Sequence, residues 1–298
     1  MKHFAITLSA MVLFCVGASA APRPGEKGEH FNRGPKVKDA PPSSIEIGQD
    51  PVTRKVTVFQ RGRGVLKQST TLTGRFRPSR MQGAWHVEEP EADQMIFRFE
   101  PAGGEVYSVN VVGYVNVFLP PGLSLIANPL HDYDNTIETL MLYNDVPDGA
   151  QIYKYVPGVG YEVNAFNAQE QAWSNPDMTL PVGVGFFFNN PSTNTIRQTF
   201  VGEVLQGRLV NPLPAGFATV GALVPQEGSI NTVHNVPGQA GDVIRFYTND
   251  LHGGGDYVSS TFVEAEHAWI PDLILKVAQG FTCEKQVAVD WVRDFRVN

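Results

Sequence analysis

Two short segments of the chain repeat one another: PGLSLIA at 121–127 and AGFATVG at 215–221. Each has glycine in second place followed by small and apolar residues, as in a strand entered from a tight turn. Further matches follow in the same order, each displaced by 92 to 96 positions: Asn135-Thr136-Ile137 with Asn231-Thr232-Val233, Ile152 with Ile244, Tyr155 with Tyr247, Tyr161 with Tyr257, Phe166 with Phe262, Trp173 with Trp269, Gly185-Phe186 with Gly280-Phe281, and Phe200 with Phe295. This conserved order predicts two tandem copies of one module.

We place the first module at 112–207 and the second at 208–298. Each has the size of a small β-sandwich or barrel and would bury about 60–65% of its unfolded surface. We expect the matched aromatic residues in the two cores, with Trp173 and Trp269 in equivalent places. Gly185 and Gly280 are expected to permit a tight approach into the strand that follows each of them.

The rest of the composition also favours an all-β protein. Glycine (29) and proline (22) are plentiful while charged residues make up only 18%, a balance typical of many short strands joined by tight turns. The segment 45–111 has runs of β-branched residues separated by Gly- and Pro-containing turns, which predicts an additional β-rich region before the modules. The best helical stretch is 135–143, where Asn135 would cap a short turn with Ile137, Leu140 and Met141 facing inward.

The first twenty residues have the pattern of a secretory signal peptide. Lys2 and His3 precede an apolar run from Phe4 to Val16, and Ala18-Ser19-Ala20 offers the small residues of a cleavage site. The run is shorter than the roughly 20 residues that span a bilayer, so we expect cleavage after Ala20 and no transmembrane segment in the mature chain. The product would be secreted to the periplasm, the medium or the cell surface. The following segment, 21–44, is poor in apolar residues and predicts a disordered leader.

Charge and cysteine content narrow the function classes. The net charge is −7, and removal of Lys2 with the signal makes it one unit more negative, which disfavours nucleic acid as a partner. Cleavage would also remove Cys15, so that Cys283 cannot form an internal disulfide. A buried, hydrophobic role for Cys283 is favoured over a reactive or intermolecular thiol.

Several phrases of the sequence resemble those of a group of secreted bacterial proteins that have tandem β-repeats and no established activity. The phrases are Gly113-Tyr114-Val115-Asn116, Pro121-Gly122-Leu123-Ser124-Leu125-Ile126-Ala127-Asn128-Pro129-Leu130, Ile152-Tyr153-Lys154-Tyr155, Gly183-Val184-Gly185-Phe186-Phe187-Phe188-Asn189-Asn190-Pro191 and Phe200-Val201-Gly202-Glu203-Val204-Leu205-Gln206-Gly207. The resemblance covers the chain from about residue 109 onward and implies a secreted β-repeat architecture. Members often end in a hydrophobic sorting tail, and the polar residues 294–298 differ from that pattern.

Motifs with a known catalytic mechanism are absent from the sequence. It contains no G-x-S-x-G elbow, H-E-x-x-H pair, phosphate-binding loop or paired-cysteine metal site. Its histidines in the repeats are scattered without metal-ligand spacing: His131, His234, His252 and His267. We therefore expect a protein that is not an enzyme and has no cofactor.

Calcium is the one cofactor that the composition leaves open. Acidic turns contain Asp132 and Asp134, and also Asp145 and Asp148, whose carboxylates are the oxygen ligands that Ca²⁺ prefers. Asp and Asn are also the ordinary residues of tight turns, and no loop has the complete EF-hand spacing. Turn formation is the favoured explanation, with a weak calcium site as the alternative.

Exposed aromatic residues could bind a ligand. Tyr161, Tyr257 and Trp85 lie near predicted turns, where their rings could stack on sugars, although packing in the core or at a sheet edge is favoured. The run Phe186-Phe187-Phe188 cannot alternate between core and solvent, so both of its faces should be covered by another sheet, module or subunit.

These observations favour a secreted, non-catalytic structural or interaction protein that associates with itself or with other surface proteins. Self-assembly would need an apolar face or exposed strand edges. The alternative is an extracellular carbohydrate-binding protein, which would need a solvent-facing aromatic residue beside polar groups. A secreted hydrolase is a more distant alternative, and it would need titratable groups that converge in a cleft.

Overall fold

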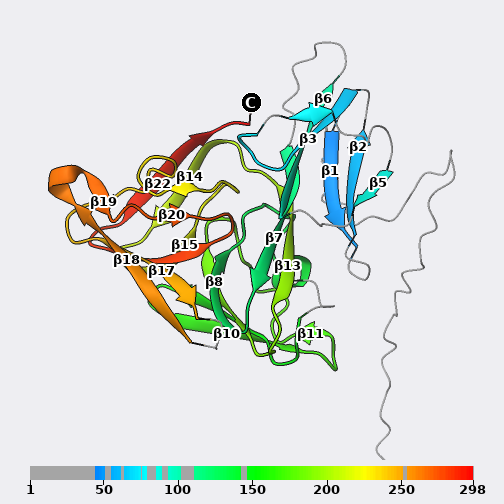
Figure 1. Cartoon of the computed structure of the whole chain (residues 1–298). Helices are drawn as coiled ribbons and strands as arrows, with labels where there is room; N and C mark the ends of the chain where they lie inside the picture. The colour runs from blue at the N-terminus through cyan, green and yellow to red at the C-terminus, as the bar shows by residue number, and fades with distance from the viewer. Residues whose placement is uncertain are drawn as a thin grey trace, which may run out of the picture. The chain divides into compact units, whose positions relative to one another are not determined.

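The computed structural model describes residues 44–50, 55–61, 64–74, 76–78, 85–88, 93–101, 111–141, 146–250 and 254–297. The expected signal peptide at 1–20 and the expected leader at 21–44 lie outside these residues, apart from Ser44. The described chain is built almost entirely of antiparallel strands, which confirms the all-β prediction (Figure 1). Among the described residues, no helix has the length and apolar character needed to cross a membrane.

The strands are numbered in chain order as in Figure 1. They are β1 (Ser44–Gln49), β2 (Val56–Arg61), β3 (Gly64–Ser69), β4 (Arg77–Pro78), β5 (Trp85–Glu88), β6 (Gln94–Pro101), β7 (Val111–Leu119), β8 (Gly122–Ala127), β9 (Gln151–Val156), β10 (Gly160–Asn167), β11 (Ala172–Trp173), β12 (Gly185–Asn190), β13 (Ile196–Glu203), β14 (Gly207–Leu213), β15 (Gly216–Gly221), β16 (Gly228–Ser229), β17 (Val243–Asn249), β18 (Gly255–Val263), β19 (Ala268–Ile270), β20 (Ile274–Leu275), β21 (Gly280–Lys285) and β22 (Val289–Phe295). Among the described residues, two short helical segments accompany them, α1 (Ile137–Leu140) and the 3₁₀ turn η2 (Glu264–Glu266).

The residues of the first module form a five-stranded sheet in the order β11-β10-β9-β12-β8, and β7 pairs with β13 in a second sheet. One hydrophobic core unites residues from both sheets. Phe186 and Phe188 of β12 enter it with Trp173, Phe200 and Ile137, all of which are buried. Burial of these large aromatic side chains removes apolar surface from water and is the main stabilising contribution.

The residues of the second module form a sheet in the order β15-β21-β17-β18-β19, while β14 pairs with β22. Read from its other edge, this order is β19-β18-β17-β21-β15, which matches β11-β10-β9-β12-β8 strand for strand. The cross-strand registers correspond as well, because Phe166 lies opposite Trp173 and Phe262 lies opposite Trp269. The second core contains Trp269, Phe281, Cys283 and Trp291.

The segment before the first module shares a sheet with it. β6 pairs with both β3 and β7, which gives the sheet β13-β7-β6-β3-β4 (Figure 1). A separate core joins this sheet to β1 and β2 through Ile45, Val58, Phe97, Phe99 and Tyr114. The opposite face of β6 and β7 contributes to a fourth core, which includes Val224 and Ala278 of the second module.

The two modules contact each other through matched backbone groups. Ala127 N donates to Ala278 O at 2.9 Å, and Gly221 N donates to Gly183 O at 2.9 Å. Ala127 corresponds to Gly221, and Gly183 corresponds to Ala278. The donor of one hydrogen bond is therefore in the first module, and the equivalent donor of the other is in the second. The modules therefore face each other about a local pseudo-two-fold axis.

The matched glycines Gly185 and Gly280 serve this contact. A Cβ atom on Gly185 would lie 2.7 Å from backbone atoms of Val220, and one on Gly280 would lie 2.7 Å from the carbonyl oxygen of Ile126. Both distances are shorter than van der Waals contact, so neither position accepts a side chain without movement of the other module's backbone. The tight approach expected at these glycines is made between modules, as well as at the start of each strand.

The Phe186-Phe187-Phe188 strand has both faces covered, which confirms that expectation. Phe186 and Phe188 face the first core, while the Phe187 ring lies 5.5 Å from the Tyr247 ring of the second module. A strand buried on both faces requires apolar residues at successive positions.

The prediction for α1 is partly wrong. Ile137, Leu140 and Met141 are buried as expected, but the helix spans only Ile137–Leu140 and its N-cap is Thr136. Asn135 instead has a φ of 52° and is itself buried, where its Oδ1 accepts hydrogen bonds from Asn128 Nδ2 and Asp132 N. Its side chain thus organises the preceding loop and leaves the helix N-terminus uncapped.

Candidate functional site: an aromatic cluster beside two open strand edges

Six aromatic rings form a continuous cluster where the two modules meet. Successive ring centroids lie 4.7, 5.3, 6.3, 5.5 and 5.3 Å apart in the order Phe217, Tyr155, Tyr161, Phe187, Tyr247 and Tyr257. All five pairs are edge-to-face, an arrangement that the ring quadrupoles favour. We call these six residues the aromatic cluster, and three of them come from each module.

Strand register explains the matched halves of the aromatic cluster. Tyr161 lies opposite Tyr155 in the β9–β10 hairpin, and Tyr257 lies opposite Tyr247 in the β17–β18 hairpin. Phe187 is nearly buried between the modules, whereas Tyr161 and Tyr257 remain 45% and 44% exposed. The cluster therefore has a buried centre and two tyrosines that reach solvent.

The exposed tyrosines are hydrogen-bond donors at neutral pH. Burial raises the pKa of Tyr161, and the neighbouring Tyr257 and Tyr155 hydroxyls raise it further. Burial also raises the pKa of Tyr257, although Arg245 opposes the rise. Both hydroxyls keep their protons at neutral pH, and the site offers two phenol groups on an apolar base.

The same two hairpins have open edges. Residues 160–164 of β10 pair with β9 on one side, and β11 pairs only with Phe166 and Asn167. Residues 255–260 of β18 pair with β17 on one side, and β19 pairs only with 261–263. In the part of the chain that the structure describes, no strand lies on the other side of 160–164 or 255–260, although the end residues Asn164 and Ser260 are buried and hydrogen-bond to Asn175 and Pro271. We call these two stretches the edge segments.

The edge segments contain neither lysine nor proline, two residues that often protect a strand edge, although each has one acidic residue, Glu162 or Asp256. Val163 and Val258 are 49% and 44% exposed. Tyr161 and Tyr257, two of the predicted ligand-binding residues, are also within them. Trp85, the third, lies opposite Phe59 on β5, and its side chain is outside what the structure describes.

Two of the predicted calcium ligands, Asp134 and Asp148, hydrogen-bond within or next to their turns. Asp134 Oδ1 accepts hydrogen bonds from Thr136 N, Thr136 Oγ1 and Thr139 Oγ1 at 3.0, 3.0 and 2.9 Å. Asp148 Oδ1 accepts one from Ala168 N at 2.9 Å. These are turn contacts, and among the described residues no group of three or more acidic, histidine or cysteine side chains has metal-binding geometry. Asp145 lies outside the described residues.

Two carboxyl groups near His131 have a raised pKa. Burial raises the pKa of both Asp132 and Glu203, and His131 opposes the rise in each case. The backbones of His131 and Glu203 form two mutual hydrogen bonds of 2.9 and 2.8 Å, while His131 Nδ1 lies 3.0 Å from Asn135 Nδ2. The loop is thus held rigidly.

Cys283 is buried in the second core, as the sequence analysis favours. Burial raises the pKa of its thiol to about 11, so the reactive thiolate is scarce at neutral pH.

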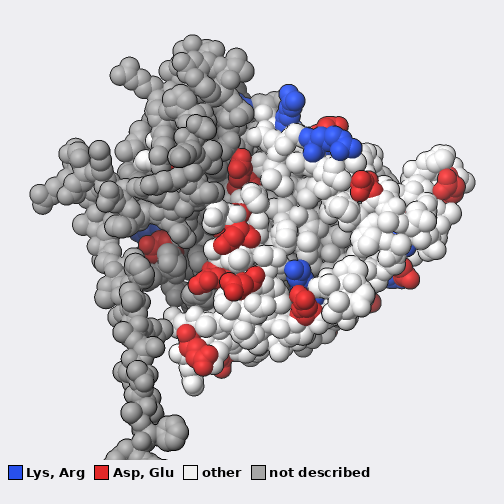
Figure 2. Space-filling view, turned by 180° about the vertical axis from the view of Figure 1, so that it is seen from behind, with Lys and Arg blue, Asp and Glu red and all other residues white. Residues whose placement is uncertain are grey.

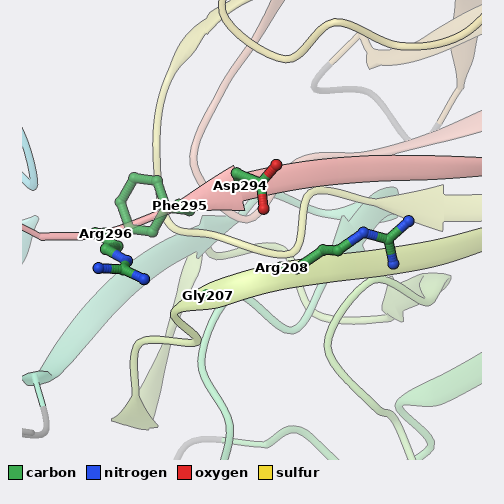
Figure 3. Close-up of a pocket in the computed structure, with 5 residues that line it drawn as sticks. All are labelled: Gly207, Arg208, Asp294, Phe295 and Arg296. Carbon is green, nitrogen blue, oxygen red and sulfur yellow. The ribbon is translucent and has the colours of Figure 1, made fainter.

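One surface hollow lies at the end of the β14–β22 pair and has a volume of about 530 Å³. Its lining residues are Gly207, Arg208, Asp294, Phe295 and Arg296 (Figure 3). The guanidinium groups of Arg208 and Arg296 point in different directions, so the positive charges do not converge on one ligand position. None of the predicted site residues lines this hollow.

The face shown in Figure 2 has more acidic than basic side chains, and several of the acidic ones lie close together along one side of its described surface. This distribution agrees with the net charge of −7. An acidic face repels phosphate backbones and other polyanions.

Comparison with known proteins finds no family model, no curated protein and no solved structure that matches this chain. The resemblance to secreted β-repeat proteins therefore stays a prediction from its motifs. The functional argument rests on the geometry of the chain itself.

The sequence identifies two residues of the candidate site, Tyr161 and Tyr257, but not the edge segments or the full aromatic cluster. Tyr155 and Tyr247 were available as a matched pair in the repeat. Their contact with Phe187 and Phe217 depends on how the modules pack, and no local pattern encodes that packing.

Proposed function

We propose that this chain is a secreted, non-catalytic structural or interaction protein made of two copies of one β-module, and that it binds a second copy of itself through its edge segments. The observation that carries this proposal is the pair of open edges beside the aromatic cluster. The shared strand order of the two sheets supports the duplication, and the resemblance to secreted β-repeat proteins agrees with it.

The edge segments have the backbone groups and side chains needed to pair with a strand of another chain. An open antiparallel edge presents unpaired N–H and C=O groups, which a strand from another chain can satisfy. The exposed side chains of Tyr161, Val163, Tyr257 and Val258 have high β-propensity and would pack across such a junction. A second copy supplies strands of the same kind.

The pseudo-two-fold relation between the modules makes a second copy a suitable partner. Isologous contacts in dimers join identical surfaces about a two-fold axis. Because each chain presents two related edges, it could contact a neighbour at both and extend into a chain of molecules. The aromatic cluster holds the two hairpins together, so each edge depends on both modules.

The charges in the edge segments set the conditions for association. Glu162 and Asp256 add like charges to the two edges, and the chain as a whole is acidic. Salt weakens their repulsion, because the Debye screening length is only about 8–10 Å near physiological ionic strength. We therefore expect association to strengthen from low to moderate salt.

The test is light scattering of the full mature chain across a concentration series at two salt concentrations. The mean mass should rise with protein concentration and with salt. Lysine in place of an exposed edge valine should prevent this, so the double variant Val163→Lys, Val258→Lys should remain a monomer. Val159→Lys is the matched control, because Val159 is 76% exposed and lies in the turn between β9 and β10.

A monomeric wild-type chain throughout the series would contradict self-association. So would a double variant that associates as strongly as the wild-type chain. The series should be repeated with calcium, since mass growth that requires calcium would locate the interaction at the acidic turns.

A glycan-binding role is a second candidate, supported by the two half-exposed tyrosines on one apolar base. Sugars stack their C–H faces on aromatic rings, and the two phenol groups could donate hydrogen bonds to hydroxyl groups. Tyr161→Ala, Tyr257→Ala should then abolish binding on a glycan array. If the wild-type chain binds no glycan, this candidate is rejected, and the self-association test is unaffected.

A further inference from the structure

Lys285 and Asp242 form a completely buried pair in the second module. The exposed fractions of their side chains are 1% and 0%, and Lys285 Nζ contacts Asp242 Oδ2. Nζ also donates to Pro237 O at 2.8 Å and lies 5.3 Å from the centre of the Trp269 ring. The Pro237 carbonyl group and the Trp269 ring thus hold the Lys285 amine directly against the Asp242 carboxyl group.

The first module shows that the fold does not need this pair. Lys285 lies opposite Gly216 at the end of β21, and Asn190 lies opposite Gly122 at the same place in β12. Asp242 corresponds in the same way to Ala150, which is completely buried. The neutral residues Asn190 and Ala150 fill these positions without any charge.

A buried ion pair is a poor way to stabilise a core. The free energy of solvation lost when both charges leave water often equals or exceeds their attraction. Apolar residues of similar size in the same positions often stabilise the fold as much or more. The pair in the second module therefore calls for another explanation.

We propose that Lys285 and Asp242 are joined by an intramolecular amide bond, formed between Lys285 Nζ and Asp242 Cγ. The Lys285 ammonium first passes a proton to Asp242 Oδ2. The neutral amine then attacks Cγ to form the C–N bond. The nitrogen, now bonded to Cγ, gives up a second proton to Oδ2, the C–Oδ2 bond breaks, and Oδ2 leaves as water, so the reaction needs no oxidant and no cofactor.

The backbone around Asp242 is arranged for this addition. Gln286 N donates to Asp242 Oδ1 at 2.8 Å, where negative charge would build up after attack at Cγ. Gln239 N donates to the departing oxygen, Oδ2, at 3.0 Å. Burial of both side chains also keeps water away from the product amide.

The bond would close a long loop in the second sheet. It joins the residue before β17 to the last residue of β21, which lie 43 positions apart in the sequence. Cross-links of this kind stabilise a fold by restricting the unfolded chain. The proposal does not depend on self-association or on any ligand.

The test is the intact mass of the full chain under denaturing conditions, followed by peptide mapping. The wild-type chain should be lighter than its sequence by the mass of one water molecule. Proteolysis should yield one branched peptide that contains both Lys285 and Asp242. Peptides containing Lys67 and Glu100, which form a partly exposed ion pair of 2.6 Å, provide an internal control and should stay separate.

Two variants sharpen the result. Asp242→Ala should have the full mass of its own sequence. Asp242→Asn should lose one ammonia and give the same branched peptide, because the asparagine side-chain nitrogen can leave as ammonia where the aspartic acid would release water. A wild-type chain with its full sequence mass overturns the proposal, and this measurement does not require any variant to fold. A mass deficit that maps to other residues overturns it as well.

Discussion

The two modules have the same strand order, yet they fill their matched positions with different side chains. The substitutions lie where β12 and β21, and their neighbours, meet the core or the other module: Phe187 against Thr282, Phe188 against Cys283, Asn190 against Lys285, Ala150 against Asp242 and Leu123 against Phe217. The backbone contacts between the modules are symmetric, whereas the side chains are complementary.

This difference indicates that the second module has specialised. The first module supplies Phe187, which covers Tyr247, and the second supplies Phe217, which covers Tyr155. At the end of β21 and just before β17, the second module has the charged pair Lys285 and Asp242 where the first has neutral residues. The shared strand order sets the arrangement, and the differing side chains join the modules.

The largest expected effect tests the charged pair. Asp242→Ala leaves Lys285 buried without its carboxyl partner, and we expect a loss of about 3–5 kcal/mol in the free energy of unfolding. The double variant Asp242→Ala, Lys285→Asn copies the first module and should recover the part of that loss caused by the unpaired lysine, but not the part caused by the missing cross-link. Urea unfolding of the three proteins measures both changes. If the single and double variants were equally stable, the neutral residues of the first module would be unable to replace the charged pair in the second.

Phe187→Ala tests the contact between modules. Truncation of this nearly buried ring leaves a cavity beside Tyr247, and such substitutions typically cost about 3–5 kcal/mol. Thr282→Ala, at the matched position of the second module, should cost far less because it removes only a small side chain. Thermal unfolding of both variants compares them. A Thr282 variant as unstable as the Phe187 variant would argue against unequal roles for the two positions.

His234 should make the second module sensitive to acid. Burial lowers the pKa of His234 to about 4, and the Arg293 guanidinium also lowers it. Between an unfolded pKa of about 6.5 and this value, the unfolded chain binds a proton that the folded chain does not. Stability should therefore fall as the pH falls through this range, by at most roughly 3 kcal/mol.

The measurement is the unfolding free energy of the wild-type chain and of His234→Gln at about pH 7.5 and about pH 4.5. The difference between the two proteins removes the contribution of the other titrating groups. It should shrink or reverse at the lower pH. A difference that does not change with pH would mean that His234 takes up its proton equally in both states.

The smallest effect is expected at two threonines that lie opposite each other between β15 and β21. Thr219 Oγ1 donates to Gly185 O at 2.7 Å, whereas Thr282 Oγ1 is buried and has no hydrogen-bond partner among the described residues. Thr282→Val should therefore stabilise the chain by about 1 kcal/mol, and Thr219→Val should destabilise it by a similar amount. Two changes of the same sign in thermal unfolding would contradict these assignments.

The sequence predicts the parts of this fold that depend on local pattern. Alternating and β-branched residues indicate strands, and the Phe186-Phe187-Phe188 run indicates a strand covered on both faces. The cap at Asn135 is predicted wrongly, because Asn135 takes part in loop hydrogen bonds that no local pattern reveals. The sharing of a sheet between β6 and β7 depends on long-range pairing, which sequence periodicity does not specify.

The candidate site could be predicted only in part, for the same reason. Tyr161 and Tyr257 are visible in the sequence as a matched pair. The open edges exist because β11 and β19 are too short to cover β10 and β18, and the sequence does not show which strands are neighbours. The buried pair did leave a signal in the sequence. Asp242 and Lys285 replace the uncharged Ala150 and Asn190 of the first module, and a comparison of the repeats at every position would have exposed both changes.

The most direct test of the account is hydrogen–deuterium exchange of the full chain in dilute and concentrated solution. If a second copy binds at the edge segments, amides within 160–164 and 255–260 should exchange more slowly in the concentrated sample, while amides at the centre of each sheet should not change. Unchanged exchange in both segments, or slower exchange confined to another surface, would contradict the claim that these edges are the interaction site.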